Sequence, residues 1–481
     1  MGEAGMGSIL VFGYMSLVLV LAVYFRSQFQ FLQKLFLPGS IIAGIILLLL
    51  SPSVLNIVPL PVAQLADGFV YHLLAVLFIV LGLRGFGSES QPGSVGTGTV
   101  VIGKVLAVQA IVGSLIVLLV IFLVSPQLFS GLGSFLMLGF GLDAPLAQYF
   151  GGFWEEELAF EGGSGIAFSF VALGFLFAYV LGLIMIVIAR KGDRVQDPAQ
   201  IADETTLTGV IPSRAPAEKQ EEAGRLTTGT QSIDAFTFHL SLVGIILLIT
   251  YSLLRFLAQW IVTEFDPGAV IVGEVLMHFQ FFFAFVFALL ARRIMKFFNV
   301  LHLLDRGVLN RTLGVAVDYM VVAAIVSIPL VVSSIHLWET LAIVIIGGLI
   351  TLGAVIWLSR KLFGTRNLER EAALFGFVSG NISSSVALLR VVDPRLENPI
   401  LRELTFAGVL SYLIAIPLIF VINLPLIGEG PLYLLYAVGL YIAYIVILFL
   451  VWHFFIRTRM PYPEEEPAEE DSALKRKRGA F

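Results

Sequence analysis

Six small polar residues lie within seven positions of the segment FGFVSGNISSSVAL (375–388), which is otherwise apolar. Gly, Ser and Asn weaken a helix, and a break frees backbone groups from the helical ladder. Free carbonyl, hydroxyl and amide oxygens suit Na⁺, and the N-terminus of a half-helix offers N–H groups to a carboxylate. The candidate residues for such binding are Ser379, Gly380, Asn381, Ser383, Ser384 and Ser385.

Close helix packing is the alternative explanation, because small residues also occur where two helices approach each other. An isolated Gly–Ser pair would favour packing, whereas the density of polar residues in this segment favours a binding site. For Na⁺ itself the candidate ligands are Asn381, Ser384 and, from a separate apolar run, Asp318.

Charged residues inside apolar runs are costly and are therefore candidates for function. Asp318 could serve Na⁺ or H⁺ coupling, or it could form an ion pair with a neighbour. Arg390 could bind a substrate carboxylate, or it could anchor its helix at the edge of the membrane. Asp143 lies where Pro145 is expected to break a helix.

The composition is that of a membrane protein. Of the 481 residues, 58% are hydrophobic and 13% are charged, whereas soluble domains have roughly 45–50% and about 25%. The chain has no cysteine, which excludes disulfides, thiolate metal sites and cysteine nucleophiles. We expect an all-α polytopic protein in a lipid bilayer that is not an enzyme, has no cofactor beyond a coupling ion and binds no nucleic acid.

Apolar runs long enough to cross a bilayer recur along the chain. We expect eleven spans, at 8–25, 36–58, 69–84, 99–124, 164–189, 236–262, 269–291, 312–333, 340–360, 404–424 and 431–457. Two further stretches, 129–155 and 370–391, are apolar but rich in Gly and small polar residues. The polar segment 191–235 predicts a cytoplasmic linker, and the charged tail 459–481 is expected to be disordered.

The basic residues assign the sides of the membrane. Lys and Arg concentrate at alternate connections, which the positive-inside rule places in the cytoplasm, so the N-terminus lies outside and the C-terminus inside. Basic residues flank the stretch 370–391 on both sides. It therefore predicts a re-entrant hairpin that enters and leaves on the cytoplasmic side. The stretch 129–155 has no basic residue at either end and predicts the mirror-image hairpin from outside.

The two halves of the chain then follow one plan in opposite orientations. Residues 1–190 and residues 236–425 each supply five spans, with a hairpin before the fifth. The two halves also share weak sequence similarity at a constant offset. LGFG (138–141) and FGFV (375–378) are 237 positions apart, as are LGFLFAYVL (173–181) and LSYLIAIPL (410–418). We expect an inverted repeat with one additional helix at 426–458, an arrangement typical of secondary transporters.

Over roughly residues 35–425 the chain resembles the bacterial sodium/glutamate symporter family. The resemblance is carried by FGFVSGNISSSVALLRVVDP (375–394), by GFG (139–141) followed by WEEELAFEGGSGIAFSFVALGFLFAYVLG (154–182), and by LPGSIIAGIILLLL (37–50). It implies a homodimer in the plasma membrane of a prokaryote that takes up glutamate with Na⁺ by alternating access, at a site between the two hairpins. It also points to Gly139, Gly141 and Gly376 as site residues.

The first hairpin departs from this family. Many members have a Gly-Pro-Gly-Gln-Ala-like run where this chain has LDAPLAQ (142–148), which adds Asp143 and Gln148 to the candidates. The substrate could therefore be another carboxylate, and the coupling ion Na⁺ or H⁺. A receptor or scaffold that does not transport is a further alternative. An intramembrane aspartyl protease would need two facing aspartates, whereas Asp143 and Asp318 belong to different repeats.

Overall fold

The protein is helical throughout the part of the chain that the structure describes. The computed structural model describes residues 2–34, 38–52, 54–58, 62–85, 93–142, 144–191, 223–229, 231–264, 276–277, 279–328, 335–364, 367–427 and 432–457. No strand occurs within these ranges, so the prediction of an all-α protein is confirmed for them. The tail 459–481 and most of the linker 191–235 lie outside the described residues.

The helices divide between the two halves of the chain. The first half forms α1 (Gly2–Gln28), α2 (Gln30–Lys34), α3 (Gly39–Leu50), α4 (Val62–Arg84), α5 (Ser94–Leu123), the 3₁₀-helix η1 (Ser130–Ser134), the π-helix η2 (Leu136–Leu142), α6 (Ala144–Glu157) and α7 (Gly163–Lys191). The second half forms α9 (Ala235–Glu264), α11 (Gln280–Phe297), η6 (Leu301–Leu303), α12 (Arg306–Val326), α13 (Leu337–Phe363), α14 (Leu368–Ser379), α15 (Ile382–Val392), α16 (Ile400–Val421), α17 (Leu424–Ile427), α18 (Leu432–Val451) and the π-helix η7 (Trp452–Ile456).

Eight helices of the described residues are long and apolar enough to cross a membrane, as a polytopic membrane protein requires. They cover Met6–Gln28, Ser94–Leu123, Gly163–Ala189, Ala235–Thr263, Arg306–Val326, Leu337–Phe363, Ile400–Leu426 and Leu432–Ile456. Their outer faces carry apolar side chains, as contact with lipid requires. On α9, for example, Leu248 and Phe256 are 68% and 63% exposed.

The other three expected spans correspond to shorter helices. The span expected at 36–58 is helical only from Gly39 to Leu50, because Pro52 follows and the chain turns back on itself. In this turn the N–H of Val58 donates to the carbonyl of Leu50 at 2.9 Å. Helix α4 covers the expected span 69–84 and begins earlier. Helix α11 covers the second half of the expected span 269–291, and most of the first half lies outside the described residues.

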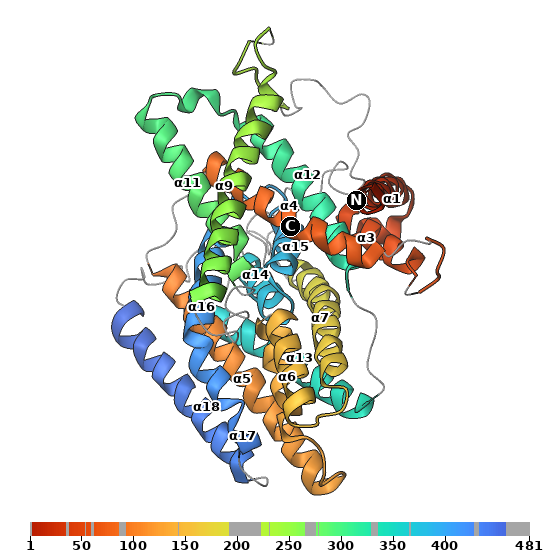
Figure 1. The fold of residues 1–481 in the computed structure, drawn as a ribbon, viewed down its shortest axis with the longest axis vertical. Helices are drawn as coiled ribbons and strands as arrows, with labels where there is room; N and C mark the ends of the chain where they lie inside the picture. The colour runs from red at the N-terminus through yellow and green to blue at the C-terminus, as the bar shows by residue number, and fades with distance from the viewer. Residues whose placement is uncertain are drawn as a thin grey trace, which may run out of the picture.

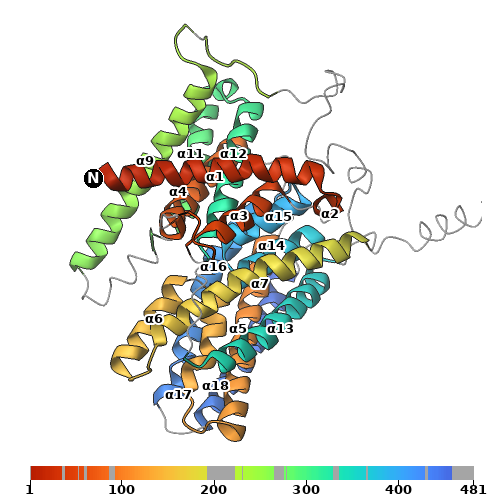
Figure 2. The ribbon, with the colours of Figure 1, turned by 90° about the vertical axis from the view of Figure 1, so that its right-hand side faces the viewer.

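Two groups of helices pack against each other (Figures 1 and 2). The first helix group consists of α1, α3, α4, α9, α11 and α12 and lies towards the top of both views. The second helix group consists of α5, η1, η2, α6, α7 and α13 to α18. Each half of the chain therefore gives its first helices to one group and its later helices to the other. The most extensive contact between the groups joins α12 to α15.

The pattern of neighbours recurs when the two halves of the chain are exchanged. In the first helix group α4 packs on both α12 and α11, and α12 packs in turn on α3 as well as on α4. The contact of α1 with α3 likewise corresponds to that of α9 with α11. In the second helix group α5 packs on α13 and α16, and α13 packs on α5 and α7. Helices that the predicted repeat treats as equivalent therefore have similar neighbours.

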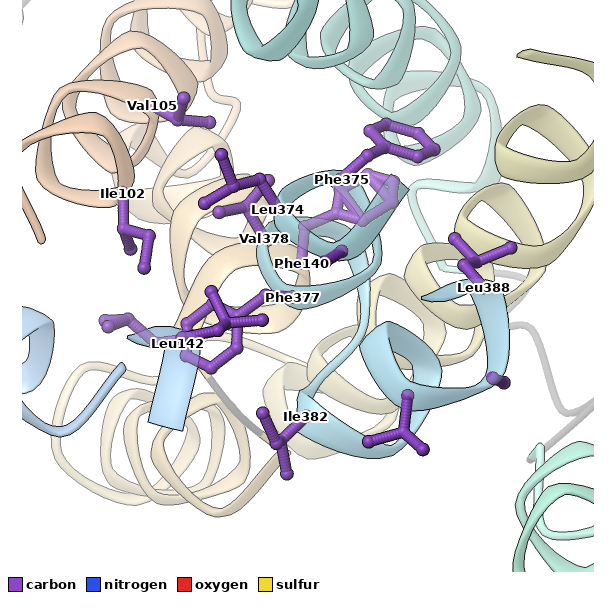
Figure 3. Close-up of a cluster of buried hydrophobic side chains, with 14 of the residues drawn as sticks. Ile102, Val105, Phe140, Leu142, Leu374, Phe375, Phe377, Val378, Ile382 and Leu388 are labelled. Atoms are coloured by element: carbon purple, nitrogen blue, oxygen red, sulfur yellow. The ribbon is translucent and has the colours of Figure 1, made fainter. Parts of the chain in front are cut away.

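The core of the second helix group surrounds the two segments that the sequence singles out. Figure 3 shows Phe140 and Leu142 of η2 beside Phe377 and Val378 of α14. All four side chains are less than a tenth exposed. Apolar side chains thus hold η2 and α14 against each other in the interior.

Candidate functional site

A break separates α14 from α15 in the interior of the second helix group. Helix α14 ends at Ser379, and Asn381 is the N-cap of α15. The Asn381 Oδ1 accepts the backbone N–H of Ser383 at 2.8 Å and that of Ser384 at 3.2 Å. A Cβ on Gly380 would lie 2.6 Å from the Ser384 hydroxyl, so a larger residue at this position would displace the Ser384 side chain. The helix break expected in FGFVSGNISSSVAL is confirmed.

The two short helices lie directly against each other. The Ser385 hydroxyl donates to the Ala373 carbonyl at 2.7 Å. A Cβ on Gly376 would lie 2.7 Å from the Cα of Ser385. Gly376 therefore allows the backbones of α14 and α15 to come into contact, which gives this predicted site residue a packing role.

A second irregular segment approaches α14 from the first half of the chain. The π-helix η2 contains Gly139 and Gly141 and is buried along its whole length. Such π-helices occur frequently at functional sites. A Cβ on Gly139 would lie 2.8 Å from the Cβ of Phe170 on α7, so η2 packs tightly there. Asp143, which separates η2 from α6, lies outside the described residues.

Gln109 of α5 links both irregular segments. Its Nε2 donates to the Val378 carbonyl of α14 at 2.8 Å and to the Thr351 hydroxyl of α13 at 3.4 Å. A Cβ on Gly141 would lie 2.2 Å from the Gln109 Oε1, so the amide lies on the backbone of η2. The Gln109 side chain is fully buried. Sequence reasoning missed this residue, although a lone amide in the apolar run 99–124 was a signal for it.

Several buried oxygen atoms around this point have no hydrogen-bond partner among the described residues. Buried polar groups almost always have one, so such a cluster requires an explanation. Ser379 and Ser384 flank the break between α14 and α15, and the Tyr179 hydroxyl on α7 lies near that of Ser384 without the geometry of a hydrogen bond. The unpartnered atoms are Gln109 Oε1, Ser379 Oγ, Ser384 Oγ and the Tyr179 hydroxyl oxygen.

The remaining predicted ligands at the break already have partners. The Asn381 Oδ1 also accepts a short hydrogen bond from the Ser383 hydroxyl, so this oxygen serves the helix cap. Ser385 is bound to α14, as described above. Ser379 and Ser384 are thus the predicted residues whose oxygens stay available for a cation, and the place of Asn381 as a Na⁺ ligand remains a prediction.

The two predicted charged residues bind each other. Arg390 of α15 donates to both carboxylate oxygens of Asp318 on α12, at 2.6 and 3.1 Å. Of the alternatives considered for Asp318, the ion pair with a neighbour is the one observed. In this conformation the Arg390 charge is neutralised by Asp318, and both residues lie between the helix groups. Gln148 lies half-buried on α6.

Ion pairs hold the start of α14 in place. Arg360 of α13 donates to Glu371 at 2.7 Å, and Arg370 donates to Glu403 of α16 at 2.6 Å. Both carboxylates are buried. The neighbouring Glu369 has its pKa raised, chiefly by burial and further by the nearby Asp393 charge.

The described residues contain no cluster of three His, Cys, Asp or Glu side chains that could hold a metal ion. A cation at the helix breaks would therefore depend on hydroxyl, amide and carbonyl oxygens. Comparisons with protein families, with curated proteins and with solved structures gave no match. The resemblance to the sodium/glutamate symporter family therefore remains a prediction from the sequence.

Proposed function

We propose that this protein is a secondary active transporter that couples the symport of glutamate or a related small carboxylate to Na⁺. One observation carries the proposal. The break between α14 and α15 lies buried beside η2, and Gln109 joins the two segments amid oxygen atoms that have no hydrogen-bond partner in the described part of the chain. Interrupted helices that meet inside a membrane protein are typical of transport sites.

The neighbours that recur between the two halves of the chain support an inverted repeat of five helices each, with α18 as the additional helix. In this arrangement α14–α15 is the re-entrant hairpin from the cytoplasmic side, and η1–α6 is its counterpart from outside. The close packing of α14 on α15 is compatible with a segment that returns to the face from which it entered.

The cation site follows from the end of α14. Carbonyl groups in the last turn of a helix lack helical donors and carry the negative end of the helix dipole. Ser379 and Ser384 add hydroxyl oxygens beside this end, and Gln109 adds its free amide oxygen. Such neutral oxygens suit Na⁺ better than a transition metal.

The carboxylate site follows from the start of α15, where the positive end of the helix dipole favours an anion. The Asn381 side chain already accepts two of the first N–H groups of this helix. A substrate carboxylate would therefore bind beside this cap, at the serine hydroxyls and the Asn381 amide nitrogen. In this proposal Arg390 becomes available only when its pair with Asp318 opens.

Transport by alternating access requires the second helix group to move against the first. The family resemblance adds a homodimer to this proposal, and the bilayer-facing helices fit a multi-pass protein. Symport of another carboxylate with Na⁺ or H⁺ would use the same proposed cation and carboxylate sites. A receptor on this fold would bind the same ligands without carrying them across.

Uptake of radiolabelled glutamate into proteoliposomes tests the proposal. We expect accumulation that requires an inward Na⁺ gradient and is lost when K⁺ replaces Na⁺. The Ser384→Ala variant should lower the apparent Na⁺ affinity, because it removes an unpartnered oxygen at the break. Ser241→Ala on the exposed face of α9 is the matched control.

The same assay separates the alternatives. Uptake of other labelled carboxylates, driven by a Na⁺ or a pH gradient, would support a transporter with a different substrate or coupling ion. Ligand binding without uptake would favour the receptor. Uptake that does not depend on any cation gradient would contradict coupled transport.

A further inference from the structure

Four arginines surround a cavity of about 400 Å³ outside the site described above. The cavity lies in the first helix group, between the end of α4, the helix α11 and the start of α12. Its lining residues are Arg84, Arg225, Arg292, Leu301, Leu304, Asp305, Arg306 and Leu309. Among the described residues that line the cavity, four are arginines and one is an aspartate.

Neutral groups hold two of these arginines in place. Arg84, which is 5% exposed, donates to the Asn310 side chain at 3.0 Å and to the backbone carbonyls of residues 395 and 396. Arg292 donates to the carbonyls of Leu83 and of Arg84 itself. These bonds fix the two guanidinium groups without neutralising their charge.

The nearby carboxylates offset this charge only in part. Asp305 lines the cavity, but its Oδ1 accepts the N–H of Val308 at 2.9 Å as the N-cap of α12. Asp393 and Glu397 act on Arg84 electrostatically, and neither forms an ion pair with it. Arg306 repels both Arg84 and Arg292 electrostatically, and its side chain forms no ion pair among the described residues.

We propose that this arginine cavity binds a phosphate group, carried either by an anionic lipid or by a small soluble molecule. The planar guanidinium fork binds phosphate in bidentate fashion, so a ring of arginines matches this ligand. Cavities of several hundred Å³ accommodate small-molecule ligands. The positive end of the α12 dipole points to the same place. Basic cavities between membrane helices on the cytoplasmic side commonly bind lipid head groups, and the charge pattern places this one there.

The bound phosphate would also fasten the linker to the helices. Arg225 belongs to the described segment 223–229, the end of the linker between the two halves of the chain. This segment packs on the start of α12, where a Cβ on Gly307 would lie 2.7 Å from the Cα of Gly224. A ligand that contacts Arg225 and Arg306 would join the linker to α12. The proposal does not depend on the transport function.

Thermal unfolding of the purified full-length protein tests this site. Arg225 and Arg306 are exposed, so the double variant Arg225→Gln/Arg306→Gln should fold like the wild type. The control Arg293→Gln/Arg311→Gln removes the same charge from exposed positions on α11 and α12 that do not line the cavity. The soluble probe is inorganic phosphate, added to delipidated protein in neutral detergent at constant ionic strength. The lipid probe is phosphatidylglycerol in nanodiscs, compared with phosphatidylcholine alone.

We expect a melting temperature raised by about 2 °C or more in the wild type and in the control variant. The rise should vanish in the Arg225→Gln/Arg306→Gln variant. A rise with inorganic phosphate identifies a soluble ligand, and a rise only with phosphatidylglycerol identifies a lipid. No rise with either probe, or an equal rise in both double variants, would overturn the proposal.

Discussion

Asp318 and Arg390 form a bidentate ion pair that joins the two helix groups. The residues are 72 positions apart, and their side chains meet at 2.6 and 3.1 Å. Asp318 lies on α12 and Arg390 on α15, and these helices form the most extensive contact between the groups. Any movement of the second helix group against the first must open this pair or carry both residues along.

A double-mutant cycle should measure this link. We expect Asp318→Asn and Arg390→Gln each to lower the free energy of unfolding, and their combination to cost less than the sum. Asp318 is 38% exposed on its side chain, so the coupling should be modest, about 0.5–1 kcal/mol. The measurement is thermal unfolding in detergent at low and high salt. Additive effects at low salt would show that the pair does not stabilise this conformation.

Replacement of Gln109 by leucine should destabilise the protein and impair cation dependence. The change removes the donor to the Val378 carbonyl and leaves a buried acceptor unpaired, which costs about 1–3 kcal/mol. The exposed Gln259→Leu on α9 is the matched control. Unfolding temperature and the Na⁺ dependence of uptake are the two measurements. A variant as stable as the control would contradict the role of Gln109 in joining the two segments.

Alanine at Gly376 and at Gly353 should have opposite effects. A Cβ on Gly376 would lie 2.7 Å from the backbone of Ser385, so Gly376→Ala must push α14 and α15 apart, at a cost of about 1–3 kcal/mol. Gly353 lies in helix α13 with nothing within 4 Å of its Cβ position. There alanine should stabilise the helix by about 0.5–1 kcal/mol. Equal melting temperatures of the two variants would argue against the close contact.

The sequence predicted the local structure of the site better than the long-range contacts between its segments. Helix breakers predicted an interruption within residues 375–388, because local backbone chemistry decides such a break, and the structure has it at Gly380 and Asn381. The role of Gln109 could not be read in this way, since its partner at Val378 is 269 positions away and only the packed structure brings them together.

Long-range pairing also limited the prediction for the charged residues. The sequence left the partner of Asp318 open, because an apolar run says nothing about which helix packs beside it. The expected span at 36–58 was too long, because its apolar content outweighed the proline that ends α3 at this point. Hydropathy thus located the membrane helices, whereas proline and tertiary contacts determined their ends and their neighbours.

Stability should fall as the pH rises through the range in which Glu369 ionises. Burial, reinforced by the Asp393 charge, raises the pKa of Glu369 in the folded protein above its ordinary value of 4.5. Below that value the carboxyl is protonated in both the folded and unfolded states and has no effect. Above it the unfolded state releases the proton first, which favours unfolding until the folded state also ionises.

The Glu369→Gln variant removes this titration. Its melting temperature should therefore decline less than that of the wild type as the pH rises above about 4.5. Parallel declines of the two proteins over this range would show that Glu369 is not the group responsible.

Substitutions of Asn381 distinguish a helix cap from a direct Na⁺ ligand. The side-chain oxygen of Asn381 accepts the N–H groups of Ser383 and Ser384, so Asn381→Ala should cost about 0.5–2 kcal/mol of stability. Asn381→Ser keeps a neutral capping oxygen, as the start of α15 requires, and should recover most of the lost stability. If Asn381 acts only through the cap, this variant should also recover the apparent Na⁺ affinity of uptake. A serine variant that regains the melting temperature and still has altered Na⁺ affinity would instead place residue 381 in contact with the ion, because the cap would be intact and no charge would have been added.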